Sequence, residues 1–271
     1  MGTSRFAFSD DIKPLLERAL AKPDVPLLKH LEDVGRRCGE LASQLWVSPD
    51  IEAWLSKNSL NKDLLLGYIE LQGYLHDLGK LDRRFQEKIK GKLKESPPHP
   101  LISLQLLRAV KRPWTMTPGA FVLECMMALS IATHHSDLYK DLYEGYPNLT
   151  LCLDSDGGFG EDPVRDSGRE CSNKKPTKYT WINQFSPYRI FNEAKLVRAW
   201  DERVMRTLYV LFNGTLRASD GAVSGGIPLE KTLFISPDSP STRLIAYMNR
   251  KGWRPYDYQE TVANNSAACR V

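Results

Sequence analysis

The chain has 271 residues, of which 42% are hydrophobic and 26% are charged, an ordinary balance for a folded protein with a sizeable core. The formal net charge of +4 permits an anionic partner without demonstrating one. No run of about 18 apolar residues and no signal-peptide pattern is present, and the five cysteines form no CxxC pair. We therefore expect a cytoplasmic protein without a membrane-spanning segment.

Most of the sequence predicts helix, beginning with two helices before residue 50. Asp10 and Asp11 can cap a first helix that extends to about Leu20, before "KPDVP" breaks it. In the second, apolar residues recur every three or four positions from about residue 28 to 46 and predict one buried stripe. His30 lies at the start of this helix.

Four more helices are predicted further along the chain. One runs from about residue 63 to 77, where Gly79 suits a left-handed turn at the helix end. Others follow Pro100 in "LISLQLLRAV", span about 119–134, and span about 191–219. The fold class predicted is therefore all-α.

The character of the sequence changes between about residues 136 and 187. This stretch is rich in Gly, Asp, Ser and Pro, which predicts an irregular insertion. The segments "LTLCL" and "KYTWI" leave room for a small β-hairpin. We expect a solvated excursion without chemistry of its own.

The five histidines are the most informative feature, because His is the commonest protein ligand of catalytic transition metals. Two carboxylates complete the set: Asp77 directly follows the second histidine, and Asp220 lies late in the chain. A carboxylate can bridge two cations, and two metals about 3.5–4 Å apart can promote displacement at phosphorus. The histidines are His30, His76, His99, His134 and His135.

The histidines do not all support a metal site equally strongly. Adjacent side chains on a helix diverge by about 100°, so a structural role for both His134 and His135 is hard to arrange. His99, taken alone, would more often be a satisfied polar residue than a ligand. Together with the carboxylates, the set predicts a dinuclear site for divalent transition metals, with Mn, Ni, Co or Fe expected and Zn or Mg as alternatives.

This ordered set resembles the HD-domain superfamily of metal-dependent phosphohydrolases, and most closely the HD nuclease of the type I CRISPR-associated nuclease-helicase. The resemblance covers about residues 25–225 apart from the insertion, and implies an HD-type helical bundle. It implies one metal held by His30, His76, Asp77 and Asp220. It implies a second held by His99, His134 and His135, with Asp77 bridging.

Two further residues take roles from the same resemblance. Lys80 matches the lysine that follows the HD pair, where an ammonium could stabilise charge on the scissile phosphate. Its alternative role is to complement a helix C-terminus. Ser219 could orient the neighbouring Asp220.

The function implied is cleavage of single-stranded DNA in type I CRISPR interference, by an endonuclease with an accompanying 3′–5′ exonuclease activity. The partners implied are single-stranded DNA, a helicase domain or separate helicase subunit, and a CRISPR surveillance complex of the Cascade type. One alternative is an HD-GYP-like cyclic dinucleotide phosphodiesterase, since "EGYP" occurs at 144–147, although Ser136 stands where that pattern is acidic. The other is a metal-binding scaffold without catalysis.

The C-terminal segment "GWRPYDYQETVA" resembles the entry to a superfamily 2 helicase, with Tyr258 and Gln259 before the first ATPase motif. The sequence contains no GxxxxGK[ST] phosphate loop. We therefore predict a nuclease domain over residues 1–250 and a linker or truncated helicase start over 251–271.

A basic stretch from Lys80 to Glu95 follows the HD pair directly, with seven basic and three acidic residues. Its side chains, Arg83, Arg84 and Lys88 among them, could guide a DNA backbone, and Phe85 could stack on a base. The alternative is a solvated helix face with Phe85 as part of a core stripe.

Overall fold

The computed structural model describes residues 6–10, 12–44, 47–107, 109–111, 117–135 and 201–227. The chain divides into two compact units, Met1–Gly226 and Ile227–Val271, and the first is the one described below. The predicted insertion at 136–187, with its hairpin, and the helicase-like segment at 251–271 lie outside the described residues.

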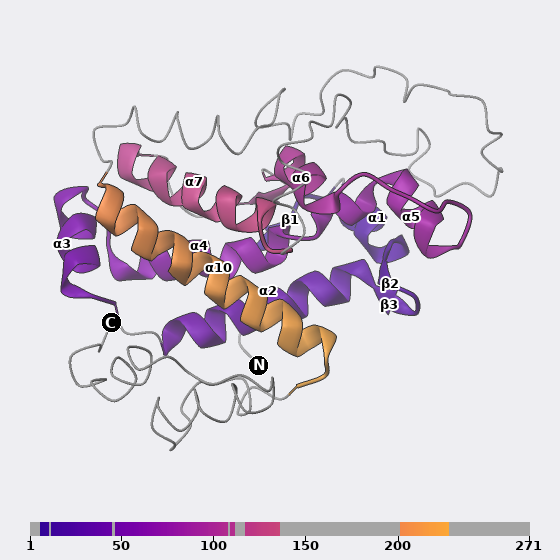
Figure 1. The fold of residues 1–271 in the computed structure, drawn as a ribbon, viewed down its shortest axis with the longest axis horizontal. Coiled ribbons are helices and arrows are strands. Elements are labelled where there is room, and N and C mark those ends of the chain that lie inside the picture. The colour runs from indigo at the N-terminus through magenta and orange to yellow at the C-terminus, as the bar shows by residue number, and fades with distance from the viewer. Residues whose placement is uncertain are drawn as a thin grey trace, which may run out of the picture. The chain divides into compact units, whose positions relative to one another are not determined.

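The described unit is mostly helical, which confirms the predicted fold class (Figure 1). Two antiparallel pairs of very short strands accompany the helices: β1 (Ala7–Phe8) pairs with β4 (Val110–Lys111), and β2 (Leu20–Lys22) with β3 (Val25–Pro26). Within the described ranges, no helix is long and apolar enough to cross a bilayer. The helices are α1 (Lys13–Arg18), α2 (Leu27–Ser43), α3 (Pro49–Lys57), α4 (Lys62–Leu75), η1 (Leu78–Leu81), α5 (Arg83–Ile89), α6 (His99–Ser103), η2 (Leu104–Leu106), α7 (Pro118–Ala132) and α10 (Glu202–Ser224).

Several helices begin at a polar side chain that caps the first free backbone N–H groups. The Asn61 side chain accepts from the N–H of Leu64 at 2.8 Å and starts α4, while Thr117 caps α7 in the same way. Asp201 caps α10 from an extended conformation, so the helix predicted from 191 to 219 does not run through this position. It begins at Glu202 and extends to Ser224 instead.

Two other predicted helices are shorter than expected. The helix α1 begins at Lys13 and ends at Arg18 before the β2–β3 hairpin, and the residue at its N-cap position is Ile12, whose side chain forms no capping bond. Asp11, one of the two predicted caps, lies outside the described residues. The helix predicted after Pro100 is interrupted: α6 ends at Ser103, a 3₁₀ turn follows, and Val110 pairs with Phe8 in a sheet. Pairing with the N-terminal strand outweighs the local helical pattern here.

The core is built around α2 and α4, with α7 and α10 packed against them. A Cβ added to Gly73 of α4 would lie 2.7 Å from the Cα of Gly35 in α2, closer than real Cβ atoms approach. The two helices therefore cross through glycines. This close crossing brings the start of α2, with His30, near the end of α4, with His76 (Figure 1).

We predict that Gly73→Ala lowers the free energy of unfolding by about 1–3 kcal/mol, because the added methyl forces α2 and α4 apart. The control is Gly214→Ala in α10, where an added Cβ meets nothing within 4 Å. That change should be neutral or stabilising, since alanine favours a helix interior. Thermal unfolding of the three proteins is the measurement, and equal midpoints would contradict the glycine crossing.

Candidate metal centre

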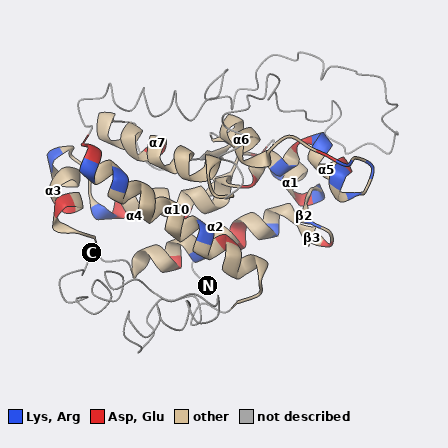
Figure 2. Ribbon diagram, in the orientation of Figure 1, with Lys and Arg blue, Asp and Glu red and all other residues tan. Residues whose placement is uncertain are grey.

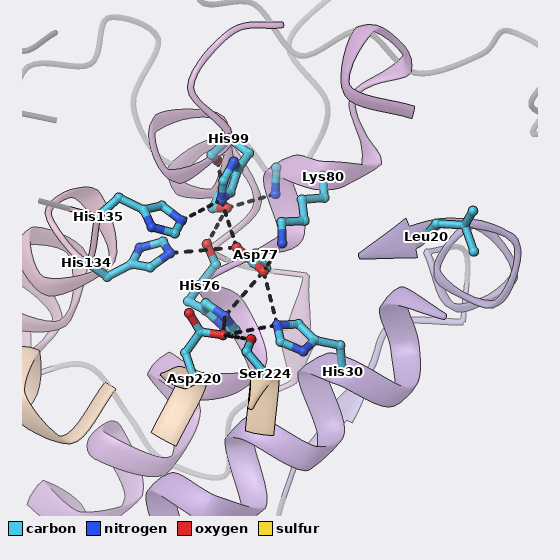
Figure 3. A network of polar contacts seen from close by, with 12 residues as sticks. Leu20, His30, His76, Asp77, Lys80, His99, His134, His135, Asp220 and Ser224 are labelled. Carbon is cyan, nitrogen blue, oxygen red and sulfur yellow. Dashed lines mark hydrogen bonds and ion pairs between the residues drawn. The ribbon is translucent and has the colours of Figure 1, made fainter. Parts of the chain in front are cut away.

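The seven predicted ligands lie together in two groups of donor atoms (Figure 3). In each group, one nitrogen or carboxylate oxygen from every residue lies within 4.8 Å of the others. The first group is His30, His76 and Asp220, and the second is Asp77, His99, His134 and His135.

The ligands come from the ends of helices rather than their middles. His30 lies in the first turn of α2, and His76 directly follows α4. His99 is the first residue of α6, while the adjacent pair 134–135 lies just beyond α7. Asp220 lies in the last turns of α10. Rigid helix ends thus position all of these side chains around one centre that contains both groups.

The carboxylate of Asp77 lies between the two groups and faces both. Its Oδ2 is 3.2 Å from Nε2 of His30 and 3.4 Å from Nε2 of His76. Its Oδ1 is 3.0 Å from Nε2 of His99 and 3.7 Å from Nε2 of His134. Each oxygen therefore faces imidazoles of a different group, as a bridging carboxylate requires.

Two histidines have their ring orientation fixed by the backbone. Nδ1 of His76 lies 2.9 Å from the carbonyl of Gly73, and Nδ1 of His134 lies 2.7 Å from that of Ile131. Because a carbonyl only accepts, Nδ1 carries the proton and Nε2 of the neutral ring has a free lone pair.

Those lone pairs point into the protein without a well-directed hydrogen bond. Nε2 of His30, His76 and His134 are all buried and lack such a partner among the described residues. Buried polar atoms are normally satisfied, so three such nitrogens around one carboxylate are exceptional. A divalent cation would satisfy them, and a histidine held through Nδ1 is the usual form of a metal ligand. The residues present therefore fit a metal centre.

Both carboxylates of the site hold their negative charge. Burial by itself raises the pKa of Asp77, but its electrostatic interactions with the His76 ring and then with the Lys80 ammonium outweigh burial and keep the pKa well below its usual range. Burial also raises the pKa of Asp220, but its interactions with His30 and then His76 outweigh burial and keep this pKa below its usual range as well. The centre thus offers two anionic ligands.

The histidines differ in how they hold a proton. Burial lowers the pKa of His99 to about 4. Partial desolvation of the His135 ring, followed by its interaction with the adjacent His134, also lowers the pKa of His135 to about 4. Burial opposes a charge on His30 too, but the neighbouring carboxylates, led by Asp220, raise its pKa above the ordinary value. His99 and His135 are therefore neutral, as metal ligands must be, across the physiological range.

Lys80 lies inside the centre, with 8% of its side chain exposed. Its Nζ is 2.6 Å from Oδ2 of Asp77 and 5.6 Å from the centre of the Phe85 ring. Phe85 also meets the His99 ring edge-on, with 5.1 Å between centroids. The Lys80 side chain thus bonds the Asp77 carboxylate.

Gly79 does not adopt the predicted left-handed turn, since the positive-φ glycines of the described chain are Gly91 and Gly226. It is needed for close packing instead. An added Cβ would overlap the carbonyl oxygen of His99 and lie 2.7 Å from the nitrogen of Ser103. The absence of a side chain lets η1 and α6 meet.

The hydroxyl that bonds Asp220 belongs to Ser224, not to Ser219 as the sequence suggested. Ser224 Oγ donates to Oδ1 of Asp220 at 3.1 Å, one helical turn away (Figure 3). Ser219 is fully buried beside the Cys38 thiol, whose pKa burial raises to about 12. The i,i+4 spacing on a helix was the available signal for Ser224.

Gln86 is a second residue of the site region that was not predicted. Its buried amide donates to the carbonyl of Lys80 at 2.6 Å and to that of Leu20 at 2.9 Å, and accepts from Leu20 N–H at 3.0 Å. This side chain fastens α5 and η1 to the β2–β3 hairpin. Glutamine in a charged run gave no signal of such a role.

The basic residues proposed for DNA differ in their surroundings. Arg84 forms a two-bonded pair with Asp82, at 2.8 and 2.7 Å, and Arg83 bonds Glu87 at 3.0 Å. Both are partly buried, whereas Lys88 is exposed. Figure 2 shows basic residues on α5 and the loop after it.

Comparison with known proteins gives one match. The family model described as "Cas3, HD domain" matches residues 18–155. This range holds Lys80 and every predicted ligand except Asp220, which the structure brings to His30 and His76 from beyond the matched residues. No curated protein and no solved structure gives a significant match.

The lowered pKa of His99 predicts how stability depends on pH in the presence of a chelator. The unfolded state takes up a proton near pH 6.5, whereas the folded state does so only near 4. Stability is therefore lost as the pH falls through this window. Between pH 7 and 5, His99→Gln should lose about 1–2 kcal/mol less than the wild type. Urea unfolding at both pH values measures this, and equal pH slopes would contradict it.

Proposed function

We propose a DNA-cleaving function for this chain, which belongs to the Cas3 HD-domain family. Membership makes it an HD-type metal-dependent hydrolase of the CRISPR Cas3 kind. The finer proposal is an endonuclease for single-stranded DNA with an accompanying 3′–5′ exonuclease activity. The observation that carries it is the Asp77 carboxylate, whose two oxygens face imidazoles of two separate groups.

We propose that each group would hold one divalent ion and that the Asp77 carboxylate, which faces both groups, would be a ligand available to both. Mn, Ni, Co or Fe suits the mixture of imidazole nitrogen and carboxylate oxygen, with Zn and Mg as alternatives. Such ions, when bound, lower the pKa of water and neutralise charge on a phosphodiester. Asp220, which accepts from Ser224, completes the first group.

The remaining catalytic work falls to residues of the chain. The ammonium of Lys80 lies beside Asp77 and supplies a positive charge that a scissile phosphate can approach. Phe85 contacts both Lys80 and His99, and limits the freedom of each. His135 is exposed at the edge of the second group, which gives a substrate a way to the centre.

The substrate path we propose follows the exposed lysines of α5 and the loop that leads from it to His99. Lys88, Lys92 and Lys94 are exposed there. In the earlier set, Arg83 pairs with Glu87 and Arg84 with Asp82. A row of cations attracts a nucleic-acid backbone irrespective of sequence. Arg83 and Arg84 contribute more to the local structure of α5.

The wider setting is also part of the proposal. We infer that residues 1–250 form the nuclease domain and that 251–271 lead toward a helicase, in the same protein or a separate subunit. The working partners would be that helicase and a CRISPR surveillance complex, in the cytoplasm. Family membership and the helicase-like "RPYDYQ" support this part of the proposal.

Asp77→Ala should abolish cleavage, with a loss of at least about 100-fold, because both groups lose their shared ligand. The assay uses circular single-stranded DNA with Mn²⁺ or Ni²⁺, and a cyclic dinucleotide in parallel. Asp63→Ala, an exposed carboxylate at the start of α4, is the control and should stay fully active.

Each outcome of that assay has a meaning. Linear DNA products from the wild type support the nuclease, and shortened products from a 3′ end support the exonuclease. Turnover of the cyclic dinucleotide alone would favour the HD-GYP-like activity, and no turnover of either substrate would favour a scaffold. A folded Asp77→Ala protein with full activity would refute the mechanism.

The lysine path predicts a loss of DNA affinity that depends on salt. Lys88→Ala combined with Lys92→Ala should weaken binding several-fold at low salt and flatten the dependence of affinity on salt concentration. The control is Lys57→Ala with Lys62→Ala, two exposed lysines near α3, which Figure 1 draws at the end of the unit opposite α5. Fluorescence anisotropy with a labelled oligonucleotide is suitable, and equal losses in both pairs would exclude a specific path.

A further inference from the structure

We propose that Ser103 is a positioning residue that fixes the spacing between the two ligand groups, an inference that rests on the dinuclear centre proposed above. Ser103 is fully buried in the last turn of α6. Its Oγ lies 2.6 Å from the carbonyl oxygen of His76 and 2.9 Å from that of His99. It also accepts a hydrogen bond from the N–H of Gly79 at 2.8 Å.

One atom therefore joins the main chains of two ligands that belong to different groups. His76 is a member of the first group and His99 of the second. A hydroxyl has one proton, so Ser103 donates it to one carbonyl at a time, and the shorter distance favours that of His76. The bond from Gly79 fills an acceptor position of the same oxygen.

The contact with His99 alone would have no special meaning, because serine in a helix often bonds the carbonyl four residues earlier. The contacts with His76 and Gly79 are different, since they cross from α6 to the HD segment. They are possible because Gly79 has no side chain, which would overlap the carbonyl of His99. Gly79 and Ser103 thus form a matched pair at one close approach.

The rings follow the backbone that this hydroxyl holds. Nδ1 of His76 is tied to its own helix through Gly73, so its Nε2 moves with the main chain. Nε2 of His99 reaches Oδ1 of Asp77 at 3.0 Å from the other side. A relative shift of about 0.5 Å between the two segments is enough to disturb a ligand set.

Ser103→Ala removes only the oxygen and leaves the N–H of Gly79 and the carbonyl of His76 without their partner. A purely structural role would lower stability alone. A positioning role also changes how two ions bind together. The matched control is Ser130→Ala, a fully buried serine in α7 whose hydroxyl has no hydrogen-bond partner in the part of the chain that the structure describes. A second control, Ile51→Ala in α3, destabilises the fold away from the centre.

The test uses the full chain, stripped of metal and titrated with Mn²⁺. Calorimetry gives the affinity of each ion, and electron paramagnetic resonance shows whether two ions are magnetically coupled. The wild type and both controls should bind two coupled ions. Ser103→Ala should bind the second ion at least about tenfold more weakly and lose most of the coupled signal, while Ser103→Thr, which keeps the hydroxyl, should retain it.

The proposal is overturned by a Ser103→Ala protein with wild-type affinities and coupling, or by an equal loss in Ile51→Ala. It is also overturned by a folded Ser103→Thr protein that lacks coupling, or by a wild type that binds a single ion. None of these readouts involves DNA. A wild type that binds two coupled ions and cleaves no DNA would refute the nuclease function. The role of Ser103 would still be decided, because it is judged from the affinities and spectra of the variants.

Discussion

A buried carboxylate is the constraint around which this protein is organised. Asp77 is 2% exposed, and an ionised group in such a place is tolerated only if its charge is met on all sides. Nitrogen atoms from Lys80, His30 and His76 surround one oxygen, and those of His99 and His134 surround the other. Neutral imidazoles do not balance the carboxylate charge by themselves. They can, however, hold the cations that would balance it together with Lys80.

The helices serve this arrangement through two unusually close approaches. At the crossing of α2 and α4, Gly35 and Gly73 let the backbones touch, which brings His30 within reach of His76. Where η1 meets α6, Gly79 does the same for the second group. Each close approach lies a few residues from a metal-ligand candidate. A change in how the helices pack would therefore change the positions of these ligands directly.

Much of this could be predicted from the sequence, with the grouping of the ligands implied by its resemblance to the HD superfamily. Histidines and carboxylates in a recognisable sequence predicted which side chains would meet, and helical periodicity predicted α2, α4 and α7 closely. What failed depended on tertiary contacts that no local pattern encodes. The helix after residue 100 yields to pairing of Val110 with Phe8, and Gly79 serves a close approach rather than a turn. Ser103 could not be found, because its partners lie 24 and 27 residues away.

The placement of Asp220 has a consequence for the whole unit. This ligand and His30 stand near opposite ends of the described chain, yet both belong to one group of donors. The donor set therefore does not exist until α10 has docked on α2 and α4. Ions that bind only the assembled set stabilise it by mass action, in proportion to the logarithm of their concentration above the dissociation constant. If the centre holds the proposed ions, their concentration would therefore set the free energy of unfolding of this unit as well as its activity.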